Sequence, residues 1–220
     1  MVIVGLTGSI GMGKSTAATM LRQMGVPVYD ADAAVHALQA PGGAALPPIE
    51  HAFPGVVKGG VLDRQALGAR VFGDKQALRK LEAIVHPLVA QRQRAFLKRA
   101  AQRGVPLVVP DIPLLFEGRG ERRVDATLVV SAPAFLQRRR VLARPNMTEE
   151  KFAGILRQQV PDRTKRRLAT KVIPTGLGLA PTRQALAKAV AALRKQPARC
   201  WPSNPWREKF TGKLARPRRI

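Results

Sequence analysis

The chain has 220 residues, 45% of them hydrophobic, which is enough to bury one well-packed domain with a sizeable insertion and excludes a chain that is disordered throughout. Its 38 Lys and Arg residues against 14 Asp and Glu residues give a net charge of +24, which suits a nucleic acid, an anionic membrane surface or a strongly anionic small substrate. The single cysteine, Cys200, excludes a disulfide scaffold and a cysteine-rich zinc module.

The N-terminal residues have neither the basic start nor the cleavage site of a signal peptide. No apolar run approaches the roughly 18 residues needed to span a bilayer. We therefore expect a cytoplasmic protein with no membrane partner.

The chain opens with a strand, a turn, a helix and a second strand. Residues 2–6 form a short apolar run rich in β-branched side chains, which is typical of a strand buried on both faces. A glycine-rich turn follows, and residues 15–24 have helical spacing. Gly25 and Pro27 end this helix, and a second apolar run occupies residues 26–29.

Further buried-strand patterns lie at residues 107–109, at 127–130 and, more weakly, at 172–173. Their spacing predicts an α/β fold of three layers, in which a parallel sheet is covered by helices.

Residues 31–104 show helical periodicity and no convincing strand, and the segment is too long for a plain crossover. Pro47 and Pro48 break it early, and Asp63 is placed to cap a helix that runs through residues 71–72. An apolar stripe follows at Leu78, Leu81, Ile84 and Val85. We interpret the segment as a helical insertion.

Two helices are predicted near the C-terminus. One begins after Thr148, with two glutamates in its first turn, and runs toward Gln159. The other begins at Thr182 and carries Leu186, Val190 and Leu193. Residues 196–220 lack periodicity and form a basic tail, which is more typical of a solvated, disordered segment than of a single-strand nucleic-acid binder.

The turn at residues 8–15 reads Gly-Ser-Ile-Gly-Met-Gly-Lys-Ser, which fits the phosphate-binding pattern of Gly, four residues, Gly-Lys-Ser. It follows a strand and opens a helix, as that pattern requires, so its backbone N–H groups and the helix N-terminus can surround phosphate. Lys14 is expected to reach the terminal phosphates, the Ser15 hydroxyl to ligate Mg²⁺ and Thr16 to donate to an inner phosphate. The residues expected to bind ATP here are Gly8, Gly11, Met12, Gly13, Lys14, Ser15 and Thr16.

Two carboxylates, Asp30 and Asp32, follow the second strand at the carboxyl edge of the predicted sheet, where open α/β folds bind ligands. A kinase that phosphorylates a hydroxyl needs a proton acceptor close to that group, and either aspartate could supply it. Either could equally be a helix N-cap, so the spacing leaves both alternatives open.

Several motifs, in their order along the chain, resemble those of the dephospho-coenzyme A kinase family. They are residues 5–15, Asp30-Ala31-Asp32, Leu62-Asp63-Arg64 with Val71-Phe72, the Leu-Glu-Ala-Ile-Val-His-Pro of residues 81–87, the Asp-Ile-Pro-Leu-Leu-Phe-Glu of residues 111–117, residues 137–144, and Gln159. Many nucleotide enzymes share the phosphate loop. The His-Pro pair combined with Asp-x-Pro-Leu-Leu-x-Glu occurs in a much narrower set of proteins. The resemblance covers about residues 1–193.

The resemblance implies a phosphate-loop kinase of three parts within residues 1–195. These are a nucleotide-binding core at 1–30, 105–137 and 168–195, a helical insertion at about 31–104 that binds the coenzyme, and a helical lid at about 138–167. It implies that the chain uses ATP and Mg²⁺ to phosphorylate the ribose 3′-hydroxyl of dephospho-coenzyme A.

The resemblance also implies roles for single residues. Asp32 would be the base, acting with Lys14 and Arg140 in catalysis. Arg140 and Arg144, four residues apart, would share a helix face over the ATP phosphates, and a solvated basic face is the alternative. The residues matching substrate contacts are His86, Pro87, Asp111 and Glu117.

The residues themselves leave alternatives for these contacts. His86 could be structural where a helix ends before Pro87. Asp111 and Glu117 could face Mg²⁺ or cap the next turn.

The sequence departs from the family after the lid. The family usually has Ala-Asp before its last strand and often Asn-Gly after it, whereas this chain has Ala169-Thr170 and Thr175-Gly176. Pro161 interrupts the helix just after Gln159, so lid residues beyond that glutamine are not assigned.

Two other functions fit parts of the sequence. The phosphate loop suits any nucleoside or nucleotide kinase, from which residues 81–87 distinguish this family. The charge suits a nucleic-acid-binding NTPase, but no second helicase or translocase motif accompanies the loop. A small-molecule substrate is therefore expected rather than nucleic acid.

Overall fold

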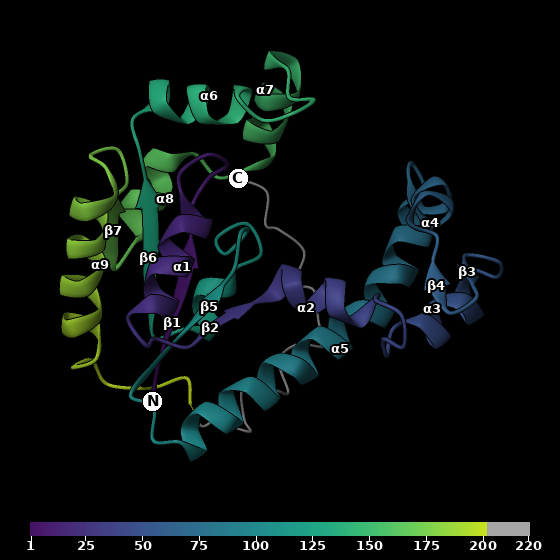
Figure 1. Cartoon of the computed structure of the whole chain (residues 1–220), viewed down its shortest axis with the longest axis horizontal. Helices are drawn as coiled ribbons and strands as arrows, with labels where there is room; N and C mark the ends of the chain where they lie inside the picture. Colours follow the sequence, from purple (N-terminus) through teal and green to yellow (C-terminus); the bar gives the residue numbers. More distant parts are fainter. Residues whose placement is uncertain (202–220) are drawn as a thin grey trace, which may run out of the picture. The chain divides into compact units, whose positions relative to one another are not determined.

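The computed structural model describes residues 1–201, and the chain forms two compact units (Figure 1). Among the described residues, the core unit comprises residues 1–28 and 104–201, and the insertion unit comprises residues 29–103. Each unit has its own hydrophobic core, and each is described by itself.

The core unit is built on a five-stranded sheet with the order β2-β5-β1-β6-β7. Its strands are β1 (Val2–Thr7), β2 (Val28–Asp30), β5 (Leu107–Asp111), β6 (Ala126–Ser131) and β7 (Lys171–Pro174). β1 pairs in parallel with β5 and β6, and β6 pairs in parallel with β7. The predicted α/β fold with a parallel sheet is confirmed.

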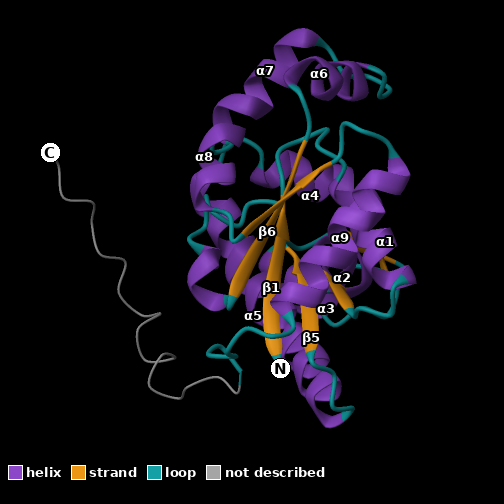
Figure 2. Cartoon of the chain, turned by 90° about the vertical axis from the view of Figure 1, so that its left-hand side faces the viewer, coloured by secondary structure: helices purple, strands orange, loops and turns teal. Residues whose placement is uncertain are grey.

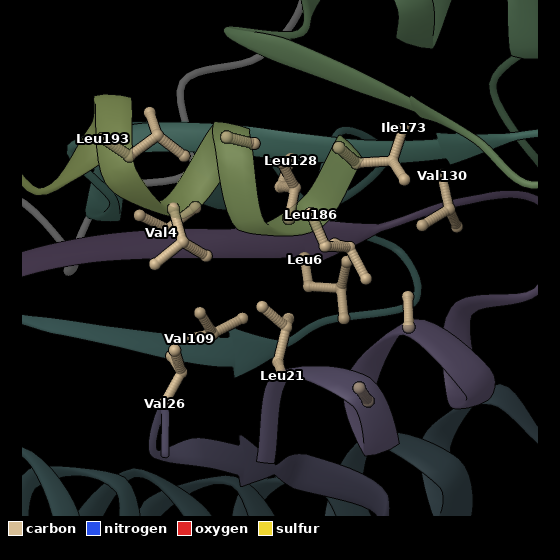
Figure 3. Close-up of a cluster of buried hydrophobic side chains, with 14 of the residues drawn as sticks. Val4, Leu6, Leu21, Val26, Val109, Leu128, Val130, Ile173, Leu186 and Leu193 are labelled. Carbon is tan, nitrogen blue, oxygen red and sulfur yellow. The ribbon is translucent and has the colours of Figure 1, made fainter. Parts of the chain in front are cut away.

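Helices cover both faces of this sheet. On one face, α1 (Lys14–Gln23) and α9 (Leu179–Leu193) bury Leu21, Leu186 and Leu193 against strand residues such as Leu6 and Leu128 (Figure 3). Because successive strand side chains point to opposite faces, Thr127 and Ser131 of β6 face the other way. There α8 (Asp162–Leu168) receives hydrogen bonds from both: the Thr127 hydroxyl donates to the Leu168 carbonyl, and Ser131 Oγ donates to Asp162 Oδ2.

Two helices, α6 (Ala134–Leu142) and α7 (Glu149–Gln158), lie beyond one end of the sheet (Figures 1 and 2). The predicted start of α7 is confirmed, since the Thr148 hydroxyl accepts a hydrogen bond from Lys151 N. An ion pair between Arg138 and Glu149 links the two helices. A 3₁₀ turn, Gly120–Arg123, precedes β6.

The insertion unit contains α2 (Ala31–Leu38), α3 (Leu46–Ala52), α4 (Arg64–Val71) and α5 (Lys75–Gln102). Asp63 caps α4 as predicted, because its carboxylate accepts from Ala66 N at 2.9 Å. The buried apolar residues of this unit are Leu38, Ala45, Leu46, Ile49, Phe53, Val56, Leu62, Leu67 and Val85.

Three expectations for the insertion are wrong. A short antiparallel hairpin, β3 (Val57–Lys58) with β4 (Val61–Leu62), occurs where no strand was expected, because two glycines with φ of 57° and 78° supply the left-handed turn that a tight hairpin needs. Pro47 and Pro48 lie in the first turn of α3, where the missing N–H groups have no intrahelical partner to lose. They begin a helix and do not break one.

The third wrong expectation is that a helix ends before Pro87. Pro87 lies inside the 28-residue helix α5. An interior proline removes one helical hydrogen bond, and burial of residues such as Val85 and Leu97 on the same helix offsets that loss. His86 is therefore a mid-helix residue, exposed to solvent.

The last helix begins three residues before the predicted Thr182. Pro181 is tolerated in its first turn, and the Thr182 hydroxyl donates to the Gly178 carbonyl. Beyond this helix, Arg199 N and Cys200 N both donate to Asp125 Oδ1, so this part of the predicted disordered tail is anchored to the core unit. Residues 202–220 lie outside the described residues. Within residues 1–201, no helix combines the length and apolarity required to cross a membrane.

Candidate active site

The phosphate loop follows β1 and ends at α1. Gly11 and Gly13 have φ of 75° and 87°, a left-handed conformation that favours glycine. Gly13 is the N-cap of α1 and has no side chain to cap the helix. The first N–H groups of the helix therefore receive no side-chain hydrogen-bond acceptor from the cap residue. Such a turn offers several N–H donors and the positive end of a helix dipole to an anion.

Lys14, the first residue of α1, makes an ion pair with Asp111, with Nζ 2.6 Å from Oδ1. Asp111 ends β5 and lies opposite Leu6 of β1, which places its carboxylate at the strand ends beside the phosphate loop. The Asp111 side chain is only 7% exposed. Asp111 thus contacts Lys14, at the end of the predicted phosphate loop.

Oxygen donors for a divalent cation are present next to this pair. Ser15 follows Lys14 and is exposed, and Asp111 supplies a carboxylate. Within the described residues 1–201, no group of three or more His, Cys, Asp or Glu side chains could hold a metal ion. Mg²⁺ does not need such a cage, because it usually takes one or two protein oxygens together with water and phosphate oxygens. The donor set therefore fits Mg²⁺.

Arg140 of α6 lies against the phosphate loop. Its Nη2 donates to the Thr175 carbonyl at 2.7 Å, and its Nη1 reaches the Gly11 carbonyl at 3.5 Å. The Thr175 hydroxyl in turn donates to the Met12 carbonyl at 2.7 Å. Thr175 therefore connects the loop after β7, the phosphate loop and Arg140, a role that sequence reasoning missed.

Arg144 does not share a helix face with Arg140, contrary to the prediction. α6 ends at Leu142, and Arg144 follows its C-cap. The reason is Pro145, which disfavours helical conformation in the residue before it. Arg144 is exposed on the loop between α6 and α7.

Glu117 contacts two residues of the predicted lid, Val160 and Lys165; the segment that contains them, residues 160–165, is called the lid base below. Its Oε1 accepts a hydrogen bond from Val160 N at 2.8 Å and lies 2.9 Å from Lys165 Nζ, and the Lys165 side chain is fully buried. Burial alone raises the pKa of Glu117, but the Lys165 ammonium and the Val160 N–H outweigh it, so the pKa is lowered from its usual value. The carboxylate is therefore held ionised by groups of the lid base.

Thr170 occupies the position where the family usually has aspartate. Its N–H donates to the Thr127 hydroxyl at 2.9 Å, and its own hydroxyl accepts from Thr127 N at 3.0 Å. This reciprocal pair joins the starts of β6 and β7, at the sheet edge opposite the phosphate loop. Thr170 therefore has a structural role.

Asp30 and Asp32, in the insertion unit, differ in their contacts. Asp30 is the N-cap of α2, and its carboxylate accepts from Ala33 N at 2.9 Å. Asp32 lies in the first turn of α2, is exposed, and has no hydrogen-bond partner among the described residues. The capping alternative therefore falls to Asp30, and the Asp32 carboxylate is exposed to solvent.

A cavity of about 520 Å³ opens between α1 and α9 in the core unit. Its lining residues are Thr16, Thr19, Met20, Gln23, Leu179, Ala180 and Arg183. Because Thr16 directly follows the phosphate loop, this cavity adjoins the candidate phosphate site.

Comparison with known proteins identifies the family. The model of the dephospho-CoA kinase family matches residues 2–179. A dephospho-CoA kinase of Novosphingobium aromaticivorans is 61% identical over 88% of this chain and 96% of its own length. One of Mesorhizobium japonicum is 56% identical over 89% of this chain and 98% of its own.

Solved structures agree in fold. A Thermus thermophilus protein superposes with a TM-score of 0.73 at 40% identity, covering 87% of this chain and 96% of the other. A dephospho-CoA kinase from Campylobacter jejuni, at 23% identity and a TM-score of 0.61, covers 88% of this chain and 98% of its own and shares the fold. With a phosphate loop, a paired Lys14 and Asp111, and relatives matched along nearly their full length, the chain belongs to the dephospho-CoA kinase family.

Proposed function

We propose that the chain transfers the γ-phosphoryl group of ATP to the ribose 3′-hydroxyl of dephospho-coenzyme A, giving coenzyme A. The observation that carries this proposal is the phosphate loop with Lys14 paired to Asp111, in a chain of this family. A lysine held at the loop by a carboxylate can exchange that partner for phosphate oxygens when a nucleotide arrives.

ATP is proposed to bind with its phosphates on residues 8–16. Lys14 would then neutralise charge on the transferring group. Ser15 and Asp111 would hold Mg²⁺, which would supply positive charge to neutralise the phosphates. The cavity beside Thr16 would take the nucleoside part of ATP, since it is partly apolar and adjoins the phosphate site.

Arg140 is proposed to stabilise the developing charge on the transferred phosphoryl group. It already lies within 3.5 Å of a phosphate-loop carbonyl, so it needs no large movement to reach a bound phosphate. Arg144, on an exposed loop, would contact the phosphates only when the lid closes.

Asp32 is proposed as the base that accepts the proton of the 3′-hydroxyl. Its exposed carboxylate is available because Asp30 performs the helix cap. His86 and Pro87, exposed on α5, are proposed substrate contacts. For Glu117 we propose support of the lid base in place of a substrate contact, because its carboxylate is engaged by Val160 and Lys165.

A coupled assay of ADP release with a substrate panel tests this function. Dephospho-coenzyme A should be phosphorylated much faster than shikimate, adenosine or AMP. Rapid turnover of one of the other acceptors would favour a different small-molecule kinase. ATP hydrolysis that rises only with single-stranded DNA would favour a nucleic-acid-dependent NTPase, the alternative suggested by the charge.

A further inference from the structure

One phosphate-loop residue, Ile10, is hydrogen-bonded by two glutamine side chains, one on α6 and one at the C-terminal end of α7. Its N–H donates to Gln159 Oε1 at 3.1 Å, and its carbonyl accepts from Gln137 Nε2 at 2.8 Å. Gln137 lies on α6, where the lid begins, and Gln159 is the C-cap of α7. Both backbone groups of Ile10 are thus hydrogen-bonded to glutamine side chains.

The chemistry of the backbone fixes which side-chain atom is used in each bond. A backbone N–H can only donate, so Gln159 must present its amide oxygen to Ile10. A carbonyl can only accept, so Gln137 must present its amide nitrogen. The two glutamines therefore have opposite requirements for substitution.

Each glutamine is itself held in place. A Cβ on Gly11 would lie 2.5 Å from Val141 Cγ2 and 3.0 Å from the Gln137 carbonyl, so α6 packs directly on the loop where Gly11 has no side chain. Gln137 is only 6% exposed. Next to Gln159, Val160 N is bound by Glu117, which pairs with the buried Lys165.

We infer that Gln137 and Gln159 are positioning residues that fix the phosphate loop, through Ile10, to α6 and to the C-terminal end of α7. They hold the loop in the shape that accepts phosphates before ATP arrives, which lowers the cost of ordering it on binding. They also keep Arg140, one turn after Gln137 on α6, beside the loop. The inference rests on the proposed use of ATP by this site.

ATP binding to five purified variants, measured by calorimetry without dephospho-coenzyme A, tests this inference. Gln137→Met and Gln159→Met each remove one hydrogen bond at nearly constant shape, and should raise the Kd for ATP about 5- to 10-fold. Gln158→Met is the matched control, because its exposed side chain makes no bond to the loop. It should leave the Kd unchanged.

The glutamate variants separate the hydrogen bond from the added charge. Gln159→Glu keeps an oxygen for the Ile10 N–H, whereas Gln137→Glu places an oxygen against the Ile10 carbonyl. Since both add the same charge, Gln137→Glu should weaken ATP binding at least 5-fold more than Gln159→Glu. Equal effects of the two, or methionine variants within twofold of the parent, would overturn the inference.

Amide hydrogen exchange supplies a readout that a general loss of stability would not reproduce. Gln159→Met should speed the exchange of the Ile10 amide while amides in the centre of β1 keep their protection. If Gln137→Met fails to fold, the Gln159 variants alone decide the matter. Because none of these readouts involves the acceptor, failure to phosphorylate dephospho-coenzyme A would count against the proposed function and leave this test intact.

Discussion

Replacement of Lys165 by methionine should destabilise the core unit more than any change of a surface lysine or arginine. The Lys165 side chain is fully buried, and its ammonium lies 2.9 Å from the Glu117 carboxylate, which is itself only 15% exposed. Methionine fills a similar volume but removes the positive charge. The variant therefore leaves a largely buried carboxylate without its cation.

The size of the effect follows from this burial. Removal of one partner of a buried ion pair typically costs about 3–5 kcal/mol, because the remaining charge cannot regain its hydration. For a chain of this length each kcal/mol lowers the Tm by about 2–4 °C, so the expected decrease is roughly 6–20 °C.

Thermal and urea unfolding followed by circular dichroism measure this loss. Arg166→Met is the matched control, because Arg166 is the neighbouring residue on α8 and is exposed. The double variant Lys165→Met/Glu117→Gln should recover much of the stability, since the amide oxygen can still accept from Val160 N and neither residue of the pair leaves a buried charge. A Lys165→Met variant that melts within about 2 °C of the parent would refute the reasoning.

The ion pair between Glu117 and Lys165 also predicts how the free energy of unfolding depends on pH. The pKa of Glu117 is lowered in the folded chain, so its contribution to the free energy of unfolding is fully present above the unfolded value of 4.5. That contribution is lost as the pH falls through the lower folded value. The difference in stability between the parent and Glu117→Gln should therefore shrink below about pH 4.5, and a difference that stays constant there would contradict the assignment.

Five further variants test the roles of Lys14, Asp32 and Thr175. Lys14→Ala should abolish phosphoryl transfer with an unchanged far-UV spectrum, and a folded variant with near-normal turnover would contradict the role of Lys14. Asp32→Asn should lower kcat by about 10²-fold or more with little change in ATP affinity, whereas Asp30→Asn should have the smaller effect because asparagine also caps helices. Thr175→Val removes the hydroxyl that binds the Met12 carbonyl and should lower kcat about 10-fold, while Thr175→Ser should retain activity; equal loss in both would exclude a role for the hydroxyl.

Local patterns in the sequence predicted much of the fold. The continuous apolar runs identify β1, β5 and β6 because strands buried on both faces contain few polar residues. The phosphate loop was recognisable because its chemistry needs glycines, a lysine and a hydroxyl at fixed spacing. Asp63 was correctly predicted as a cap, and the start of α7 after Thr148 was correctly predicted, because both signals involve only neighbouring residues.

The features that sequence reasoning missed depend on tertiary packing. Pro87 was expected to end a helix, but packing of the long helix α5 outweighs one lost hydrogen bond. The bond between Ile10 and Gln159 joins residues 149 positions apart, and no local pattern indicates such a contact. Thr175 likewise acquires its role only where the loop after β7 meets the phosphate loop.

The most direct test of the proposed activity is the identity of the product. The chain, ATP, Mg²⁺ and dephospho-coenzyme A should yield ADP and a coenzyme that carries one additional phosphomonoester, which ³¹P NMR with proton correlation should assign to the ribose 3′-carbon. Lys14→Ala should form none of it. A phosphate found on another hydroxyl, or ADP formed without any phosphorylated coenzyme, would contradict the account.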